Sequence, residues 1–436
     1  MFTTAEFNIP NDGKTLVTSQ LQALIDRCGE NGGGTVVITP GSYLTGGLEL
    51  VDNLQLIISP GAVLLGSHDL KDYKLHSTVE DYPFDEGQDG VRAILFARNK
   101  TNISVEGTGI IRGGGKHFEN CGTRRARPRN ILFAGCRKVT VKNIRLEESG
   151  FWNQHYLQCT DVVIDSVQVH SLYGINNDGI DIDSCDRVVV RGCRIDSQDD
   201  AICLKSSTLV PCQNVLVTDC ITTTHANHFK IGTETHGGFN NVHACNLIML
   251  TSELKEVMHV GGGDPRGAAG IALGSVDGAY IRNVVVENVF MDGVRVPFYL
   301  RHGDIHRVYP GLDATAPRQF DGITIRNVKA KNASDQGCYF IGLPEMPIKN
   351  VVLENSEFSF ENCTDESRLN IQVPDDRKIH TTMEAFGKFP CYGLYARYID
   401  GLTVNNVKFH AQGPDPRPAV QYQKCRKVTL NAVIDE

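Results

Sequence analysis

The sequence has 436 residues, and its 43 Lys and Arg against 51 Asp and Glu give a formal charge of −8. Its 41% hydrophobic and 22% charged residues are typical of a folded globular chain, which excludes disorder and a coiled coil. No run reaches the roughly 18 apolar residues of a membrane-spanning helix, and the acidic balance supplies no basic face for nucleic acid. We therefore expect neither a membrane nor a nucleic acid as partner.

The N-terminal segment is predicted to form a helix followed by a strand. Met1–Pro10 lacks the charged and apolar regions of a signal peptide, which predicts a cytoplasmic protein, or a secreted or periplasmic one whose leader has been removed. Residues 16–28 have the apolar spacing of an amphipathic helix that ends before Gly29, and residues 35–41 (TVVITPG) read as a strand. Such a helix would cover the open edge of the sheet that follows.

Two further sets of side chains have more than one interpretation. The basic run Arg124, Arg125, Arg127 and Arg129 is either a local cation group for an acidic ligand or a solvated loop. The fourteen cysteines do not require an oxidising compartment, because a chain this long can bury a core without disulfides. We expect free, buried thiols.

One pattern recurs along the chain: turn-forming residues, a short run of β-formers, a polar pair and a second apolar run. Between the first β-formers of successive copies, six of the nine steps lie between 23 and 28 residues. The longer steps predict insertions at about 251–269, 303–319 and 364–390. The first β-formers of the ten copies are Val139, Val162, Val188, Val215, Val242, Val284, Ile323, Val351, Leu402 and Val428.

This repeat predicts a coil of strands. Within each copy the apolar residues alternate, and no copy has room for a crossover helix, so βαβ units are excluded. Stacking each turn about 4.8 Å from the last pairs the backbone and buries one side of every strand. The predicted fold class is all-β: a right-handed parallel β-helix with an N-terminal capping helix. We expect one domain over 1–436, with the cap and first coils in 1–66 and the main coils in 100–436.

Three successive copies carry a third strand, with acidic residues at its start. Aligning the apolar residues of GIDID, AICLK and FKIGT places Asp178, Asp200 and Asn227 in one column, with Asp199 beside it. Carboxylates so close together raise the pKa of at least one of them, which suits paired acid and base chemistry such as glycoside hydrolysis. Asp and Asn also suit turns, which is the alternative interpretation. Asn176-Asn177-Asp178 and Gln198-Asp199-Asp200 lie one turn apart, and turn formation alone explains this pair less well than catalysis does.

Other polar residues on this face are candidates for substrate contact. They are Asn176, Asp181, His225, Asn227, His228 and Lys230, with Lys205 and Glu234 as weaker candidates. Trp152, the single tryptophan, lies one turn earlier, where it either packs against a sugar ring or belongs to the core.

At this point the sequence resembles glycoside hydrolase family 28, the polygalacturonases and rhamnogalacturonases. The resemblance rests on residues 32–50 and 106–115, on Asn176–Gly179, and on Gln198-Asp199-Asp200 at a spacing of 21 residues. It implies that Asp199 is the general acid and that Asp178 and Asp200 activate a water on the opposite face, with inversion at the anomeric carbon. It implies a pectic poly- or oligosaccharide substrate and no metal or organic cofactor.

The chain departs from the family pattern at two places. Ala226-Asn227-His228 stands where polygalacturonases have Gly-His-Gly. Family members that cleave rhamnogalacturonan also lack the Gly-His-Gly triplet, so a pectic substrate is still expected. Gly270–Gly274 (GIALG) stands where the carboxylate-binding Arg-Ile-Lys is expected, so Lys230, Arg295 or Arg301 would have to replace these cations. The insertions would close one end of the groove and make the enzyme exo-acting.

Two other functions fit the same scaffold. A polysaccharide lyase or epimerase would need a Lys, Arg or Tyr base and often Ca²⁺, and a lyase would release an unsaturated product that absorbs in the ultraviolet. A non-catalytic carbohydrate-binding coil would bind glycans and release no new reducing ends.

Overall fold

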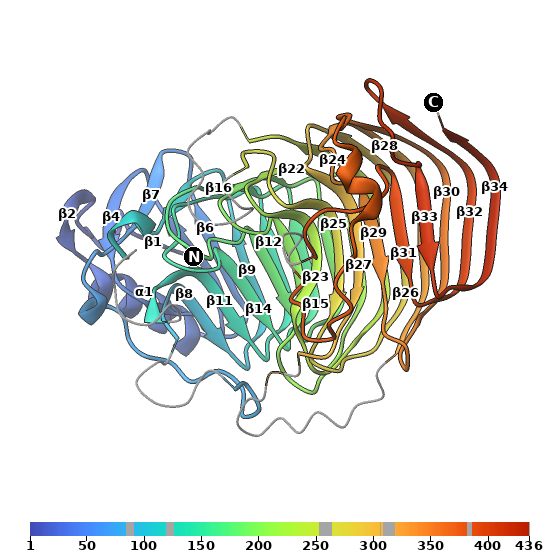
Figure 1. Ribbon diagram of the computed structural model, residues 1–436. Helices are drawn as coiled ribbons and strands as arrows, with labels where there is room; N and C mark the ends of the chain where they lie inside the picture. Colours follow the sequence, from blue (N-terminus) through green and yellow to red (C-terminus); the bar gives the residue numbers. More distant parts are fainter. Residues whose placement is uncertain are drawn as a thin grey trace. The chain divides into compact units, whose positions relative to one another are not determined.

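The structure has two compact units. A computed structural model of the chain describes residues 1–83, 91–118, 126–252, 264–305, 307, 319–381 and 386–435. The units are Met1–Asp200 and Ala201–Glu436, and strands dominate both (Figure 1). That the whole chain is a single domain stays a prediction.

The expected N-terminal helix is present, with ends that differ from the prediction. Helix α1 spans Thr18–Glu30 and buries Leu21, Leu24, Ile25 and Cys28. It begins two residues late because Leu16 is still paired with Leu44 of a neighbouring strand. It continues through Gly29, so the predicted end was wrong. The helix contacts the first strands of the unit, and its role as a cap stays a prediction.

The first unit stacks its strands in three parallel columns. The first column is β5 Leu48–Glu49, β8 Ala93–Arg98, β11 Arg129–Ala134, β14 Gln154–Leu157 and β17 Ile180–Asp183. The second is β1 Phe2–Thr3, β3 Gly34–Ile38, β6 Leu54–Ile58, β9 Thr101–Glu106, β12 Arg137–Lys142, β15 Thr160–Asp165 and β18 Asp186–Arg191. The third is β2 Asp12–Leu16, β4 Gly41–Thr45, β7 Ala62–Gly66, β10 Ile110–Arg112, β13 Arg145–Glu147, β16 Gln168–Ser171 and β19 Arg194–Ser197. Among the described residues of this unit, the 3₁₀ turn η1 Leu70–Asp72 follows β7 and η3 Gly115–Phe118 follows β10.

The second unit continues the same plan with longer strands. One column is β20 Ile202–Ser206, β23 Asn227–Thr235, β25 Ala269–Ser275, β27 Val296–His302, β29 Cys338–Ile341, β31 Leu394–Arg397 and β33 Val420–Gln423. On the other side β21 Cys212–Thr218 and β22 Ile221–Thr224 pair with β24 Phe239–Leu250. Beyond it lie β26 Ile281–Asp292, β28 Phe320–Ala333, β30 Ile348–Phe360, β32 Ile399–Ala411 and β34 Arg426–Asp435 (Figure 1). One 3₁₀ turn, η6 Glu366–Asn370, follows β30.

The predicted register is observed inside each unit. Val139, Val162 and Val188 face one another in the first unit, and Val215 through Val428 do so in the second. The bend between the two apolar runs is made by a residue with positive φ, such as Asn143 at 59°. This left-handed residue turns the chain while keeping the alternation on both sides.

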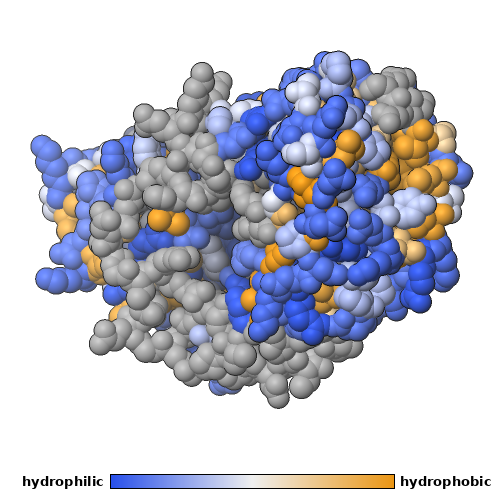
Figure 2. Space-filling view, viewed as in Figure 1, coloured by the Kyte–Doolittle hydropathy of each residue, from blue (hydrophilic) through white to orange (hydrophobic). Residues whose placement is uncertain are grey.

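The predicted insertions coincide with segments between strands, at 251–268, 303–319 and 361–393. Parts of them, 253–263, 306, 308–318 and 382–385, lie outside the described residues. At the C-terminal end of the second unit, Leu430 and Tyr422 are exposed. Figure 2 shows hydrophobic patches among hydrophilic atoms over the part of the surface where β33 and β34 lie. In the described part of the chain, no helix has the length and apolar character required to cross a membrane.

The described cysteines are free thiols, and most are buried, as expected. Cys136, Cys159 and Cys185 stand beside the register column of the first unit, and the Cys159 N–H donates to Cys185 Sγ at 3.2 Å. They behave as small wall residues that pack between coils. Cys121 lies outside the described residues.

Candidate active site

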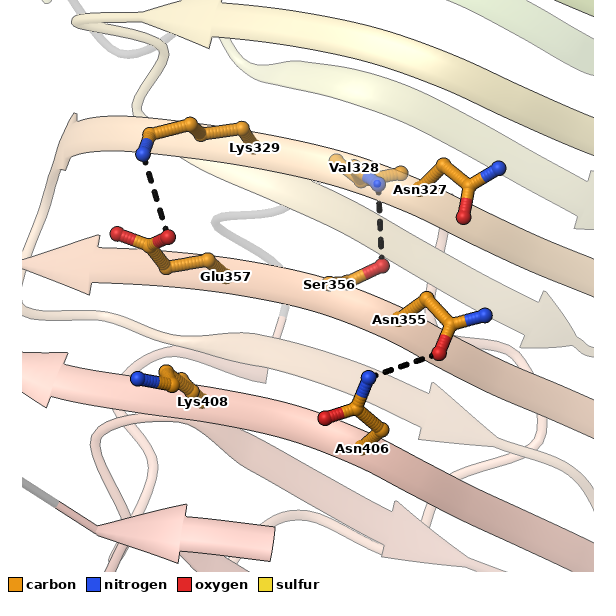
Figure 3. Close-up of a pocket in the computed structure, with 8 residues that line it drawn as sticks. All are labelled: Asn327, Val328, Lys329, Asn355, Ser356, Glu357, Asn406 and Lys408. Carbon is orange, nitrogen blue, oxygen red and sulfur yellow. Dashed lines mark hydrogen bonds and ion pairs between the residues drawn. The ribbon is translucent and has the colours of Figure 1, made fainter. Parts of the chain in front are cut away.

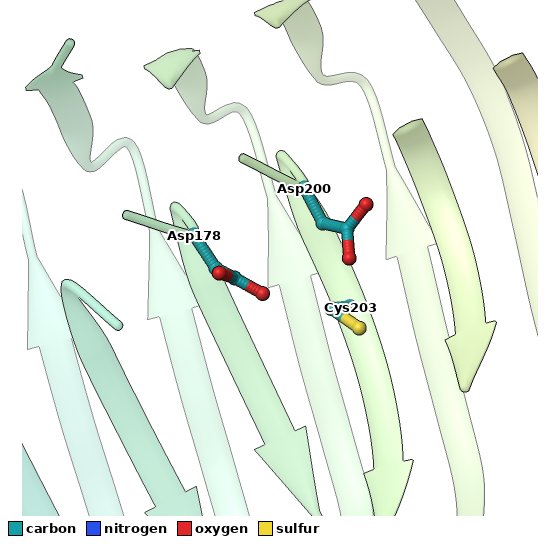
Figure 4. Close-up of side chains that lie close together, drawn as sticks. All are labelled: Asp178, Asp200 and Cys203. Carbon is teal, nitrogen blue, oxygen red and sulfur yellow. The ribbon is translucent and has the colours of Figure 1, made fainter. Parts of the chain in front are cut away.

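The three predicted catalytic aspartates lie in two bends of the first unit, on successive turns. Asp178 precedes β17, whereas Asp199 and Asp200 follow β19. The Gly179 N–H donates to the Asp200 carbonyl at 2.8 Å and so joins the two bends. Carboxylate oxygens of Asp178 and Asp200 lie within 4.8 Å of each other. Figure 4 shows both side chains on the same side of their strands. The first unit thus brings together the predicted carboxylates.

The surroundings of Asp199 keep its carboxylate in place. The Asn176 Nδ2 donates to Asp199 Oδ2 at 3.4 Å, and the Asp200 N–H donates to Asp199 Oδ1 at 2.9 Å. The Ser197 hydroxyl donates to the Asp199 carbonyl at 2.7 Å. Asp199 is 9% exposed, against 2% for both Asp178 and Asp200. Asp199 is therefore the carboxylate that solvent and a ligand reach most readily.

Asn177, between the two predicted residues Asn176 and Asp178, ties this bend to the preceding coil. Its Nδ2 donates to the Ser149 carbonyl at 2.7 Å and to the Tyr173 carbonyl at 2.6 Å. Its Oδ1 accepts from the Ser171 hydroxyl at 2.7 Å. All polar atoms of its side chain are hydrogen-bonded, which explains why the backbone before Asp178 has a defined path.

Several neighbours of the aspartates are buried rather than exposed to a ligand. Asp181 is 0% exposed on β17, so its predicted substrate contact stays a prediction. His155 pairs with Asp183 at 3.2 Å, and both are fully buried. Trp152 is 5% exposed and stacks on Phe151 at 4.8 Å. Of its two interpretations, the structure supports core packing.

The basic run does not form a solvated loop where the structure describes it. Arg127 and Arg129 are 3% and 0% exposed, and their guanidinium groups lie 5.2 and 4.8 Å from the centre of the Phe151 ring. A planar guanidinium stacks well on an aromatic face, which explains why these arginines are buried. Arg124 and Arg125 lie outside the described residues.

The predicted side chains of the second unit lie on and before β23. Its register with β20 is the predicted one, with Ile202 opposite Phe229 and Leu204 opposite Ile231. Asn227 is 7% exposed, and its carbonyl accepts from the Ala201 N–H at 2.8 Å. Lys230, on the opposite side of the strand, is half-buried.

The two predicted histidines of the second unit are buried. His225 is 0% exposed and His228 is 1% exposed. The Nδ1 of His228 lies 2.8 Å from Thr222 Oγ1. Burial lowers the pKa of His228 to about 3, so its ring is neutral at physiological pH. Contact of either ring with a ligand stays a prediction.

A group of charged residues surrounds Glu234 in the second unit. Lys205 Nζ and Arg307 Nη1 each lie 3.5 Å from one of its oxygens. Burial alone would raise the pKa of Glu234, but Lys205, Arg307 and Lys230 outweigh it and hold the pKa well below its ordinary value. Burial and the charges of Lys230 and Arg307 lower the pKa of His380. Arg307 and His380 were missed from the sequence because they lie in two insertions, where no repeat gives their register.

The other cations proposed to replace Arg-Ile-Lys are already engaged. The Arg301 guanidinium is 1% exposed and donates to the carbonyls of His302, Asp376 and Arg377 at 3.0, 3.0 and 3.1 Å. Arg295 lies 3.8 Å from Asp264. Contact of Arg301 with substrate stays a prediction.

That the site uses no metal stays a prediction. The third side chain of Figure 4, Cys203, belongs to the second unit, where its thiol donates to the Gly232 carbonyl at 2.9 Å.

A shallow pocket of about 370 Å³ lies elsewhere in the second unit, over β28, β30 and β32 (Figure 3). Lys329 pairs with Glu357 at 3.2 Å at its edge, and Asn406 donates to Asn355 at 2.9 Å along its floor. None of the predicted site residues lines it. Its lining residues are Asn327, Val328, Lys329, Asn355, Ser356, Glu357, Asn406 and Lys408.

The chain is similar to known proteins over most of its length. The family model described as "Glycosyl hydrolases family 28" matches residues 73–373. A Vitis vinifera protein named "Probable polygalacturonase" is 24% identical over 80% of this chain and 72% of its own. The structure of a hyperthermoactive exopolygalacturonase from Thermotoga maritima covers 94% of this chain and 91% of its own, with a TM-score of 0.71 and 18% identity. A Yersinia enterocolitica family 28 exopolygalacturonase covers 98% and 78%, also with a TM-score of 0.71 and 18% identity. These likenesses confirm the predicted fold class, a right-handed parallel β-helix.

Proposed function

The chain belongs to family 28 of the glycosyl hydrolases, and on this basis we propose that it hydrolyses a pectic poly- or oligosaccharide with inversion at the anomeric carbon. The observation that carries the proposal is the hydrogen bond from Gly179 to the Asp200 carbonyl, which holds the Asp178 bend against the Asp199–Asp200 bend. Names of relatives support a polygalacturonase-like substrate. Because the chain as a whole is negatively charged, individual Lys or Arg side chains near the site would bind an acidic polysaccharide.

The three aspartates have different proposed roles. Asp199, the most accessible, donates a proton to the leaving oxygen. Asp178 and Asp200, with oxygens within 4.8 Å of each other, together accept a proton from the attacking water. Inversion needs that water on the face of the sugar opposite the acid. Asn176 positions the acid through its hydrogen bond to Asp199.

We propose Lys230 as a cation that binds a substrate carboxylate in the second unit. Lys230 is half-buried on β23, whereas Arg301 is 1% exposed and donates to backbone carbonyls. Asn227 and His228, which precede Lys230 on β23, are proposed as further substrate contacts.

The central test is Asp199→Asn, which keeps the shape of the side chain but removes the acidic proton. The variant is expected to lose activity on a panel of pectic fragments by about 10²-fold or more while its circular dichroism and melting temperature are unchanged. Asp196→Asn is the matched control, because Asp196 lies three residues earlier and pairs with His170 on the coil surface. It should stay active.

The form of the product distinguishes the remaining possibilities. NMR of the first product should show the inverted anomer. Full activity of Asp199→Asn would refute the assignment. An unsaturated product that absorbs in the ultraviolet would favour a lyase, and glycan binding without new reducing ends would favour a binding coil.

A further inference from the structure

An exposed aromatic ring and a lysine lie together in the first unit. Tyr173 is 39% exposed, and the Lys116 Nζ lies 5.3 Å from the centre of its ring. Among the described residues the Lys116 ammonium makes this contact and no ion pair with a carboxylate. A cation held by a ring instead of an anion keeps its charge available to a ligand.

The backbone of Tyr173 is fixed next to the Asp178 bend. The Tyr173 carbonyl accepts from Asn177 Nδ2 at 2.6 Å, and Asn177 directly precedes Asp178. Gly174, with φ at 96°, makes the turn between them. Tyr173 is thus part of the short loop that carries Asn176 to Asp199.

The 3₁₀ turn that carries the lysine is fixed beside Glu148 and Ser149. Gly115 opens η3, and its N–H donates to the Glu148 carbonyl at 2.7 Å. A Cβ on Gly115 would lie 2.1 Å from the Ser149 carbonyl oxygen, so the 3₁₀ turn presses closely on that bend. The same Ser149 carbonyl accepts from Asn177 at 2.7 Å. The Glu148–Ser149 segment therefore contacts both η3, which carries Lys116, and Asn177 of the Tyr173 loop.

We propose that Tyr173 and Lys116 form a binding subsite for a uronate unit of the substrate, adjacent to the aspartates of the first unit. The ring supplies an apolar edge against which a sugar packs, and the ammonium pairs with the sugar carboxylate. This inference rests on the proposed function and adds to it a subsite distinct from Lys230. It predicts that the charge of the sugar, as well as its ring, contributes to binding at this position.

Binding to an inactive protein tests the subsite without relying on turnover. In the Asp199→Asn background, isothermal titration calorimetry would compare a galacturonate tetramer with its methyl ester, for the parent and for Lys116→Gln, Tyr173→Ala and Tyr173→Phe. Lys142→Gln, an exposed lysine of β12, is the matched control.

Each variant has a distinct expected result. Lys116→Gln should bind the acid about three- to tenfold more weakly and leave the affinity for the ester unchanged. Tyr173→Ala should weaken both ligands by about fivefold, and Tyr173→Phe should restore them. Lys142→Gln should match the parent.

The possible failures are separable. If the parent binds the tetramer and Lys116→Gln binds it equally well, or weakens acid and ester alike, the subsite proposal is overturned while the proposed function stands. If the parent binds neither ligand, both proposals are overturned.

Discussion

Asn177 stabilises the candidate site through one buried side-chain amide that bonds three groups from two segments. Its replacement by alanine leaves the carbonyls of Ser149 and Tyr173 and the hydroxyl of Ser171 without that partner. Unpaired buried polar groups each cost about 1–3 kcal/mol. We expect Asn177→Ala to lower the free energy of unfolding by about 2–4 kcal/mol, measured by urea denaturation.

Asn176→Gly is the contrasting change one residue earlier. Asn176 has φ at 60°, which glycine adopts without strain, and its side chain makes one long hydrogen bond, to Asp199. Its stability should stay within about 1 kcal/mol of the parent while its turnover falls. Equal stability losses in the two variants would contradict this division of roles.

His228 provides a test of stability against pH. Burial lowers its pKa to about 3, whereas an unfolded histidine titrates near about 6.5. As pH falls the unfolded chain binds the proton first, so the stability from a neutral His228 is complete above about pH 6.5 and is lost toward pH 3. His228→Asn, which can keep a hydrogen bond to Thr222, should lose about 2 kcal/mol less stability between pH 7 and pH 4.5. Urea denaturation at both values measures this.

His170 supplies the control of opposite sign. A hydrogen bond to Asp196 raises its pKa, so its contribution to stability is present at low pH and lost as pH rises through that value. His170→Asn should therefore increase the loss on acidification. The interpretation fails if both variants shift the pH dependence in one direction.

At the scale of the strand, alternation decides which side chain matters. Val284 of β26 is fully buried between Val242 and Ile323, while its neighbour Val285 faces outward and is half-buried. Val284→Ala should cost about 2 kcal/mol and Val285→Ala less than about 1 kcal/mol in unfolding free energy. Similar costs for both would show that the register is wrong.

The pairing of strands could be predicted from the sequence because equivalent positions of the repeat lie opposite one another on successive turns. Val139, Val162 and Val188 could be aligned from their spacing alone, and the structure pairs them as aligned. The helix boundary was less predictable, since Leu16 had apolar helical spacing yet pairs with Leu44, a contact that local spacing does not encode.

The candidate site was predictable to the same degree and for the same reason. Asp178 and Asp200 occupy repeat positions, so their proximity followed from the alignment. Arg127 and Arg129 could not be placed, because their burial depends on Phe151 of the next turn. Their charge alone favoured an exposed loop.

At the scale of the whole molecule, stability comes from stacked coils without covalent links. The described cysteines are free. We expect all fourteen cysteines to react with a thiol reagent in denaturant without reductant. Dithiothreitol should leave the melting temperature unchanged. Fewer reactive thiols would reveal a disulfide and contradict the structure.

The strand register of the second unit determines which deletions or duplications the fold tolerates. Val242, Val284 and Ile323 occupy equivalent places on consecutive turns, so losing one complete turn would leave two surfaces that still match. Losing one residue within β26 would instead reverse inside and outside for the rest of that strand. Viable deletions and duplications should therefore cluster at lengths of a full circuit.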